Sequence, residues 1–462
     1  MKIESTIEFV TQEFDKFVNR DASKYYVRRN NTKSNAFSEG GAYFGFIRPE
    51  EDPAGQYHDF SIVLFPGDEE GNTPWILSLG VGTLGFQNDY DLAAKPGFRR
   101  LFQSIISSNG FCKTDFVDLD QPLPKSYIEK VPHLSDTLER YKTVLPVCEI
   151  LEDIESEDSK NKIRAFIAIY AKARDWLTNR ERKNYYDTAI CKLQQMEDID
   201  EVLVVNELLI QRKFAVLTGA PGVGKTRLAK FIGKKLNAQI FFTQFHAETN
   251  YSDFIYGINP DLDASGLKYT HKIGTFHQAL DFALQNPEKP TLLIVDEINR
   301  ANLANILGPI FYLFEYQMDD NLNAPKIEIS PKLSISKLPN NFYMIGTMNT
   351  ADRSLAVVDF ALRRRFAWYE LLPSPIKNNP HFYTKDFQDL SEIFYWYADS
   401  TELSLQPGQG YFLAENDEDF LNRVKYELYP LIKEYLQEQL LISAKEEFNS
   451  YFLNRIGKPL FQ

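Results

Sequence analysis

Short apolar runs separated by turn residues dominate the first part of the chain and predict strands. These runs lie at residues 42–46, 60–65 and 75–79. Apolar residues at helical spacing predict helices at 7–18 and 98–107. We therefore expect an α+β N-terminal domain at residues 1–130, followed by a mostly helical connector at residues 131–195.

From residue 196 onward, apolar runs alternate with helical segments. The runs lie at residues 214–218, 240–243, 291–295 and 342–347. Runs that are apolar throughout, rather than alternating with polar residues, are typical of parallel strands buried on both faces. Residues 196–372 are thus predicted to form an α/β core with helices on both sides of a parallel sheet.

The length and composition limit the classes of protein that this chain can belong to. A chain of 462 residues is too long for one ordinary core, and 44% hydrophobic with 25% charged residues is normal for a globular protein. No apolar run approaches the roughly 18 residues that span a bilayer, and the first residues lack the apolar stretch of a secretory signal. We expect a cytoplasmic protein with no membrane segment.

Cysteines and charge exclude other classes. Cys112, Cys148 and Cys191 are widely spaced and odd in number, so we expect buried reduced thiols rather than disulfides or a zinc site. The net charge of −13 argues against non-specific coating of nucleic acid by the whole surface. A local basic stretch lies at residues 162–183; a solvated helix face is the favoured interpretation, and a phosphate-contacting surface is the alternative.

The strongest chemical motif follows the run at 214–218. It matches G-x-x-x-x-G-K-[ST] at every fixed position: Gly219-Ala220-Pro221-Gly222-Val223-Gly224-Lys225-Thr226. In such a loop the glycines let backbone N–H groups surround phosphates, and the following helix N-terminus adds positive potential. Lys225 is expected to reach the β- and γ-phosphates, Thr226 to bind Mg²⁺, and the neighbouring Arg227 to belong to the nucleotide site.

Polar residues also end two further strands. Asp296 and Glu297 follow the run at 291–295, and Asn349 follows the run at 342–347. At the carboxyl edge of a parallel sheet, Asp296 would hold Mg²⁺ and Glu297 would act as general base. Asn349 would position the attacking water. The alternative is that these residues only cap backbone groups.

Arginines follow this region. Arg363, Arg364 and Arg365 are consecutive and cannot share one helix face, so Arg363 or Arg364 is expected to reach a neighbouring subunit as an arginine finger. An exposed basic helix end is the alternative. Arg300 is a second candidate for an intersubunit contact, and Asp352 is expected to orient an arginine or the water.

These strings resemble the McrB family of AAA+ motors. The resemblance rests on Val295-Asp-Glu-Ile-Asn-Arg-Ala-Asn-Leu303 and on Met348-Asn-Thr-Ala-Asp-Arg-Ser354 with the arginines after it. The stretch Gly410-Tyr411-Phe412 is similar to the family's C-terminal lid, which implies a helical lid at 373–462. The implied fold is an α/β AAA+ P-loop NTPase module with that lid.

The resemblance also implies function. It implies a homo-hexameric ring, Mg²⁺-dependent hydrolysis of GTP rather than ATP, and a partner McrC-like nuclease subunit, with no nuclease site in this chain. DNA would be contacted through the N-terminal domain and the ring. The phosphate loop itself does not report the base, because phosphate contacts are common to ATP and GTP.

Two other functions fit parts of the pattern. One is an ATP-dependent remodelling ATPase similar to the MoxR group; the other is a nucleotide-gated sensor or scaffold with little turnover. Glu297 together with Asn349 argues against the scaffold. Aromatic residues at 25–26 and 43–44 could line a pocket for a flipped base, but aromatics in such runs are more often core.

Overall fold

The computed structural model describes residues 2–19, 21–38, 41–68, 70, 72–193, 200–260, 269–315, 325–351 and 360–461. The chain forms two compact units. The first comprises Met1–Glu197 with Tyr395–Tyr397, and the second comprises Asp198–Phe394 with Ala398–Gln462. None of the helices within the described ranges is long and apolar enough to cross a lipid bilayer.

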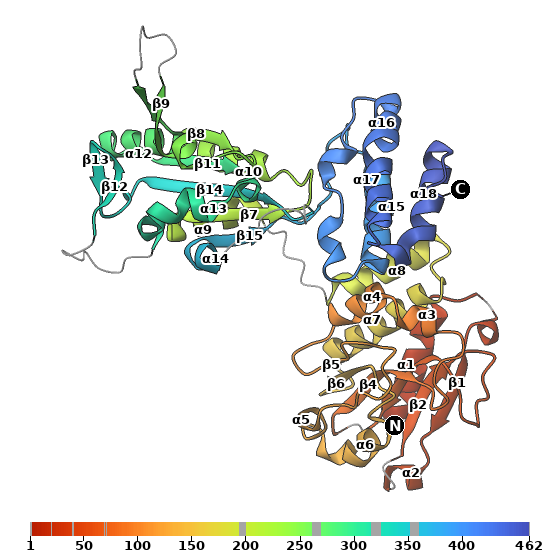
Figure 1. The fold of residues 1–462 in the computed structure, drawn as a ribbon. Coiled ribbons are helices and arrows are strands. Elements are labelled where there is room, and N and C mark those ends of the chain that lie inside the picture. Colours follow the sequence, from red (N-terminus) through yellow and green to blue (C-terminus); the bar gives the residue numbers. More distant parts are fainter. Residues whose placement is uncertain are drawn as a thin grey trace. The chain divides into compact units, whose positions relative to one another are not determined.

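The first unit is built on a six-stranded antiparallel sheet with the order β1-β2-β3-β4-β6-β5 (Figure 1). Its strands are β1 (Val27–Asn31), β2 (Tyr43–Ile47), β3 (Phe60–Phe65), β4 (Trp75–Val81), β5 (Phe111–Cys112) and β6 (Val147–Leu151). Its helices are α1 (Lys2–Asp15), α2 (Ser34–Ser38), α3 (Tyr90–Ala93), α4 (Pro96–Gln103), α5 (Lys125–Ile128), α6 (Ser135–Tyr141), α7 (Glu157–Ala173) and α8 (Arg180–Cys191). The expected α+β architecture is confirmed.

Both faces of this sheet are covered, so every residue of its central strands β3 and β4 is buried. On β2, Phe44 and Phe46 enter the larger core with α1, α4 and α7. The alternate residue Tyr43 packs on the opposite face against a smaller core that includes Val63 and Phe65. Side chains of successive strand residues point to opposite faces, which produces this division.

Residues 131–195, expected to form a mostly helical connector, contain helices α6, α7 and α8 but also contribute the strand β6 to the sheet of the first unit. β6 lies inside the sheet and pairs with β4, and α7 buries Ile163, Phe166 and Ile167 in the larger core. Both elements therefore belong to the same unit as residues 1–130.

Several basic side chains between residues 162 and 183 form contacts inside the first unit instead of a solvated helix face. Lys162 contacts the buried Glu149 at 2.9 Å, and Arg164 contacts Glu13 at 3.2 Å. Further along, the Arg174 guanidinium donates to both carboxylate oxygens of the buried Asp89. Arg182 is itself buried. These cations tie helices to the rest of the unit, which disfavours a phosphate-contacting surface built from them.

The thiols differ from one another. Cys148 is buried as expected, whereas Cys112 is half-buried and Cys191 is exposed. The expectation of three buried thiols is wrong for Cys191, which lies in the last turn of α8.

The second unit contains a five-stranded parallel sheet with the order β15-β7-β14-β11-β8 (Figure 1). Its strands are β7 (Phe214–Gly219), β8 (Gln239–Gln244), β11 (Thr291–Asp296), β14 (Phe342–Asn349) and β15 (Ala367–Glu370). The helices of this core are α9 (Glu201–Arg212), α10 (Lys225–Lys235), α11 (Tyr251–Phe254), α12 (Thr275–Gln285), α13 (Leu303–Leu307) and α14 (Phe360–Arg365). The four strands predicted here are confirmed, and each ends at the same edge of the sheet.

Successive residues of these strands enter two different cores. Phe214 and Val216 of β7 pack on one face, whereas Ala215 and Leu217 pack on the other with α10. This double burial confirms the expected sheet with helices on both sides. Two hairpins were not predicted: β9 (Tyr256–Pro260) with β10 (Tyr269–Ile273), and β12 (Ile327–Ser330) with β13 (Leu333–Ile335).

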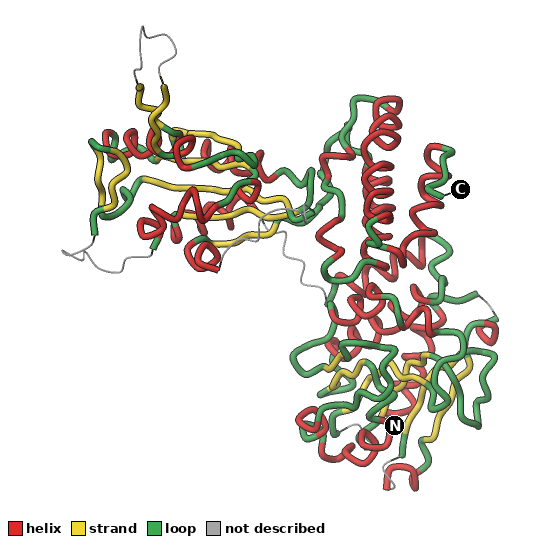
Figure 2. The backbone as a smooth tube through the Cα atoms, viewed as in Figure 1, coloured by secondary structure: helices red, strands yellow, loops and turns green. Residues whose placement is uncertain are grey.

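The C-terminal part of the second unit is helical, as expected for a lid (Figure 2). Its α-helices are α15 (Thr384–Tyr397), α16 (Asp417–Arg423), α17 (Tyr429–Gln437) and α18 (Lys445–Ile456). Apolar side chains of these helices pack against one another; for example, the ring centroids of Phe394 and Phe448 lie 5.4 Å apart.

Candidate nucleotide site

The glycine-rich loop joins β7 to α10 at the carboxyl edge of the parallel sheet. Gly219 approaches a neighbouring backbone so closely that a Cβ there would lie 2.4 Å from the Leu371 carbonyl oxygen. Gly224 has φ of +92° and is the N-cap of α10, a conformation that favours glycine. The loop therefore needs glycine at both places, and it directs the N-terminus of an 11-residue helix toward the site.

Lys225 lies at the base of this loop. Its Nζ donates to the carbonyl oxygens of Gly219 and Ala220, both at 2.8 Å. Burial lowers the pKa of the Lys225 ammonium, and the negative charges of Glu297 and Asp296 oppose that shift only in part. The ammonium is thus held against the loop that is expected to hold phosphates.

A carboxylate with two threonines forms the centre of the site. Asp296 Oδ1 accepts hydrogen bonds from Thr226 Oγ1 and from Thr347 Oγ1, both at 2.6 Å. The Thr347 hydroxyl in turn accepts the backbone N–H of Glu297 at 3.1 Å. The structure therefore brings Thr226, Asp296 and Glu297 together as predicted, and adds Thr347.

This group fits a Mg²⁺ ion. Hydroxyl and carboxylate oxygens are the hard donors that Mg²⁺ prefers, and nucleotide-bound Mg²⁺ needs only one or two protein ligands because phosphates and waters complete its shell. Thr226 Oγ1 and Asp296 Oδ1 would be those two ligands. A 2.6 Å hydrogen bond joins these two oxygens, so both potential Mg²⁺ ligands lie next to each other.

Glu297 follows β11 in a left-handed conformation, with φ of 53° and ψ of 46°. This backbone is uncommon for a residue with a side chain, and such positions cluster at functional sites. The Glu297 carboxylate is half-buried and contacts Arg300 Nε at 3.3 Å. Arg300 therefore contacts the carboxylate of its own chain.

Asn349 ends β14 and is the register partner of Gly219, the first residue of the loop. Its Oδ1 accepts the backbone N–H of Ala351 at 3.3 Å, so the capping interaction considered above is present. Thr350 adds a backbone hydrogen bond to the Gly219 carbonyl oxygen at 3.2 Å. Asn349 is thus placed beside the loop, while Asp352 lies outside the described residues.

The three consecutive arginines differ in their surroundings. Arg365 is largely buried and forms an ion pair with Glu315. Arg363 is exposed and lies over the Trp368 ring, and Arg364 is 72% exposed with a 3.9 Å contact to Glu315. Arg227 is also exposed, on the first turn of α10.

A lid segment contacts the loop from the other side. The N–H groups of Gly408 and Gly410 donate to the carbonyl oxygens of Pro221 and Gly222, each at 2.9 Å. The Gln409 side chain donates to Val223 O at 2.8 Å. The sequence analysis did not predict a role for Gln409 or for Thr347. Gln409 directly precedes the motif at 410–412 and Thr347 directly precedes the motif at 348–354, and this adjacency was the signal that could have identified them.

Comparison with known proteins agrees with this geometry. Residues 215–366 match the family described as AAA domain (dynein-related subfamily). The Type IV methyl-directed restriction enzyme EcoKMcrB subunit of Escherichia coli is 40% identical over 168 residues, which are 35% of this chain and 36% of that protein. The Type II restriction enzyme BsuMI component YdiS of Bacillus subtilis is 27% identical over 190 residues, covering 33% of this chain and 55% of that protein.

These alignments span about a third and about half of the two relatives. Among solved structures, a RuvB mutant from Thermotoga maritima is 20% identical, with a TM-score of 0.22 over 42% of this chain and 47% of that one. The family match and the sequence similarity coincide with the sheet, the loop and the carboxylates described above. Over the aligned part, this chain is therefore similar to the AAA domain and to the EcoKMcrB subunit.

Proposed function

We propose that this chain is a nucleotide-hydrolysing AAA+ motor subunit that acts in DNA restriction. The observation that carries the proposal is the convergence of Thr226 and Thr347 on Asp296, with the Glu297 backbone joined to the same network. Nucleotide binding alone would not require a carboxylate held next to the Mg²⁺ ligands. The restriction context is supported by the two relatives, one of which is a subunit and the other a component of a restriction enzyme.

In this proposal each residue has a distinct task. Lys225 moves its ammonium from the loop carbonyls to the β- and γ-phosphate oxygens, which are stronger acceptors because they are charged. Thr226 and Asp296 hold the Mg²⁺ ion, which neutralises charge on the phosphates when bound. Asn349 orients a water molecule beside the loop.

Glu297 acts as general base. It accepts a proton from that water while the water oxygen bonds to the γ-phosphorus and the bond to the bridging β–γ oxygen breaks, leaving a nucleoside diphosphate and phosphate. The contact with Arg300 holds the Glu297 carboxylate in one orientation in the nucleotide-free chain.

The exposed arginines support assembly into a ring. Arg363 is exposed and the Arg364 side chain is 72% exposed, so both guanidinium groups are accessible to a second copy. We propose a homo-hexamer in which Arg363 or Arg364 stabilises transition-state charge in the neighbouring site. Nucleotide-dependent light scattering tests this: hexamers support it, and monomers at saturating nucleotide contradict it.

GTP is the proposed substrate, on the basis of the resemblance to McrB proteins. The proposed partner is an McrC-like nuclease subunit, and the proposed target is DNA contacted by the first unit and the ring. The test is turnover of GTP and of ATP with and without a candidate McrC-like nuclease subunit. Faster GTP turnover that the partner stimulates supports the proposal; preferential ATP turnover that ignores the partner favours a remodelling ATPase instead.

A further inference from the structure

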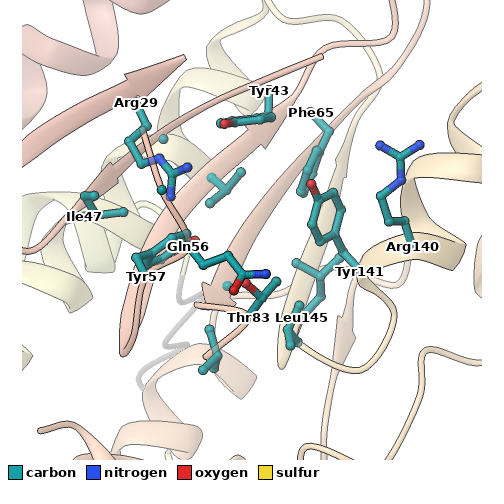
Figure 3. A pocket seen from close by; sticks show the side chains of 16 residues that line it. Arg29, Tyr43, Ile47, Gln56, Tyr57, Phe65, Thr83, Arg140, Tyr141 and Leu145 are labelled. Carbon is teal, nitrogen blue, oxygen red and sulfur yellow. The ribbon is translucent and has the colours of Figure 1, made fainter. Parts of the chain in front are cut away.

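The first unit contains a cavity of about 360 Å³ that the proposed motor does not use. It lies over β2, β3 and β4, on the sheet face opposite α7, and it is bordered by α6 and by residues 55–57 (Figure 3). Its size lies in the range of small-molecule sites. Gly45 and Gly80 line its floor and have no side chains to fill it.

The charge of the cavity points to an anionic ligand. Arg29 and Arg140 line it, and none of the described lining residues is acidic, in a chain whose net charge is −13. The Arg29 guanidinium lies 4.8 Å from the Tyr57 ring centroid and 6.0 Å from that of Tyr43 (Figure 3). Its Nε is buried and has no hydrogen-bond acceptor among the described residues. An unsatisfied buried donor is costly, so this group gains from an acceptor supplied by a ligand.

The walls point to a planar ring. Tyr43, Tyr57, Phe65 and Tyr141 line the cavity, and the Phe65 and Tyr141 rings stack at 5.7 Å with 29° between their planes. The Tyr57 hydroxyl is fixed by a 2.8 Å hydrogen bond to Ser61 Oγ. Rings that are held in place in this way can stack with a flat ligand without further loss of side-chain entropy.

Other ligand classes fit less well. The positive charges of two arginines would repel a cationic ligand. An aliphatic ligand has no acceptor and would leave Arg29 Nε without a hydrogen bond. Of the aromatic residues that the sequence pattern singled out, Tyr26 and Phe44 are buried core, whereas Tyr43 borders this cavity. We propose that the cavity binds a nucleotide unit, with its base between the aromatic walls and its phosphate at Arg29, while Arg140 adds positive charge from the other side of the cavity (Figure 3). The unit is either a free nucleoside monophosphate or one nucleotide of a single strand.

Calorimetric titration of the full chain tests this proposal. The chain carries Lys225→Ala, so that the phosphate loop does not bind the probes and the result does not depend on hydrolysis. The probes are the four deoxynucleoside 5′-monophosphates and a single-stranded oligonucleotide of about ten nucleotides. The variants are Arg29→Met and Arg140→Met, and the matched control is Arg28→Met, an exposed arginine on the same strand that does not line the cavity.

We expect Arg29→Met to weaken binding at least about tenfold and Arg140→Met several-fold, with Arg28→Met within about twofold. Binding of monophosphates identifies a free nucleotide as the ligand, and binding of the oligonucleotide alone identifies a strand; both support the proposal. No binding of any probe overturns it, as does equal binding by the parent and both cavity variants. If Arg29→Met fails to fold, Arg140→Met decides, because Arg140 is exposed. A negative result leaves the proposed hydrolysis untouched.

Discussion

The Thr226 hydroxyl donates a 2.6 Å hydrogen bond to Oδ1 of Asp296, 70 residues further along the chain. Thr226 lies in the first turn of α10 and Asp296 is the last residue of β11. The two side chains meet because the parallel strands end at one edge of the sheet. Thr347 donates to the same oxygen from β14. Three elements thus fix one carboxylate before any nucleotide is present.

Thr347→Val tests the importance of this network. Valine keeps the shape of threonine but removes the hydrogen bonds to Asp296 and to the Glu297 N–H. Hydrogen bonds to charged groups contribute about 1.5–3 kcal/mol, so we expect turnover to fall roughly ten- to hundredfold while nucleotide still binds. The matched control is Thr291→Val at the other end of β11, whose buried hydroxyl has no hydrogen-bond partner among the described residues. Equal turnover in both variants would remove Thr347 from the account.

Lys225→Ala should abolish nucleotide binding, because the substitution removes the ammonium at the base of the loop. We expect affinity to fall by at least about a hundredfold, since charge-assisted contacts to phosphate are among the strongest hydrogen bonds. Equilibrium binding of a fluorescent nucleotide measures this. Lys230→Ala on the exposed face of the same helix is the control, and retained affinity in Lys225→Ala would refute the assignment of the loop.

The same lysine predicts a pH effect. Burial lowers its pKa below the ordinary 10.5, despite the opposing charges of Glu297 and Asp296. Because the protonated form binds phosphate, affinity should be full at neutral pH and decline as the pH rises through this lowered pKa. Dissociation constants measured across the alkaline range check the sign. A decline only above 10.5, or an affinity that increases with pH, would contradict it.

Gln409→Ala tests the contact between the lid and the loop. The substitution removes the 2.8 Å hydrogen bond to Val223 O but leaves the backbone bonds of Gly408 and Gly410. We expect nucleotide affinity to change about three- to tenfold, the effect of one hydrogen bond of roughly 1 kcal/mol. Gln406→Ala is the control, since Gln406 bonds to Ser391 within the lid. Identical affinities for the two variants would show that Gln409 has no influence on the loop.

The sequence predicted those features that depend on local pattern. The four apolar runs from 214 to 347 became β7, β8, β11 and β14, and the loop with its carboxylates fell at their ends. The strand β6 within residues 131–195 was not predicted, because it is defined by a distant partner: Leu77 pairs with Glu149, a relation that no local window contains. The partners of the basic residues, Glu13 and Asp89, are distant for the same reason.

Contacts between motifs were also beyond the local pattern. Thr347 lies inside a strand that was predicted correctly, yet its role depends on Asp296, which is 51 residues away in the sequence. The lid segment reaches the loop from 186 residues away through Gln409 and Val223. Such positions can be recognised only once the strands are placed side by side.

Glu297 is the proposed general base of nucleotide hydrolysis. The most direct measurement compares Mg²⁺-dependent phosphate release, from GTP and from ATP, by the parent chain and by Glu297→Gln, with nucleotide binding measured in parallel. We expect turnover of at least one nucleotide by the parent and a loss of about a hundredfold or more in Glu297→Gln, with binding retained. Equal rates for the two chains, or no turnover of either nucleotide by the parent, would contradict it.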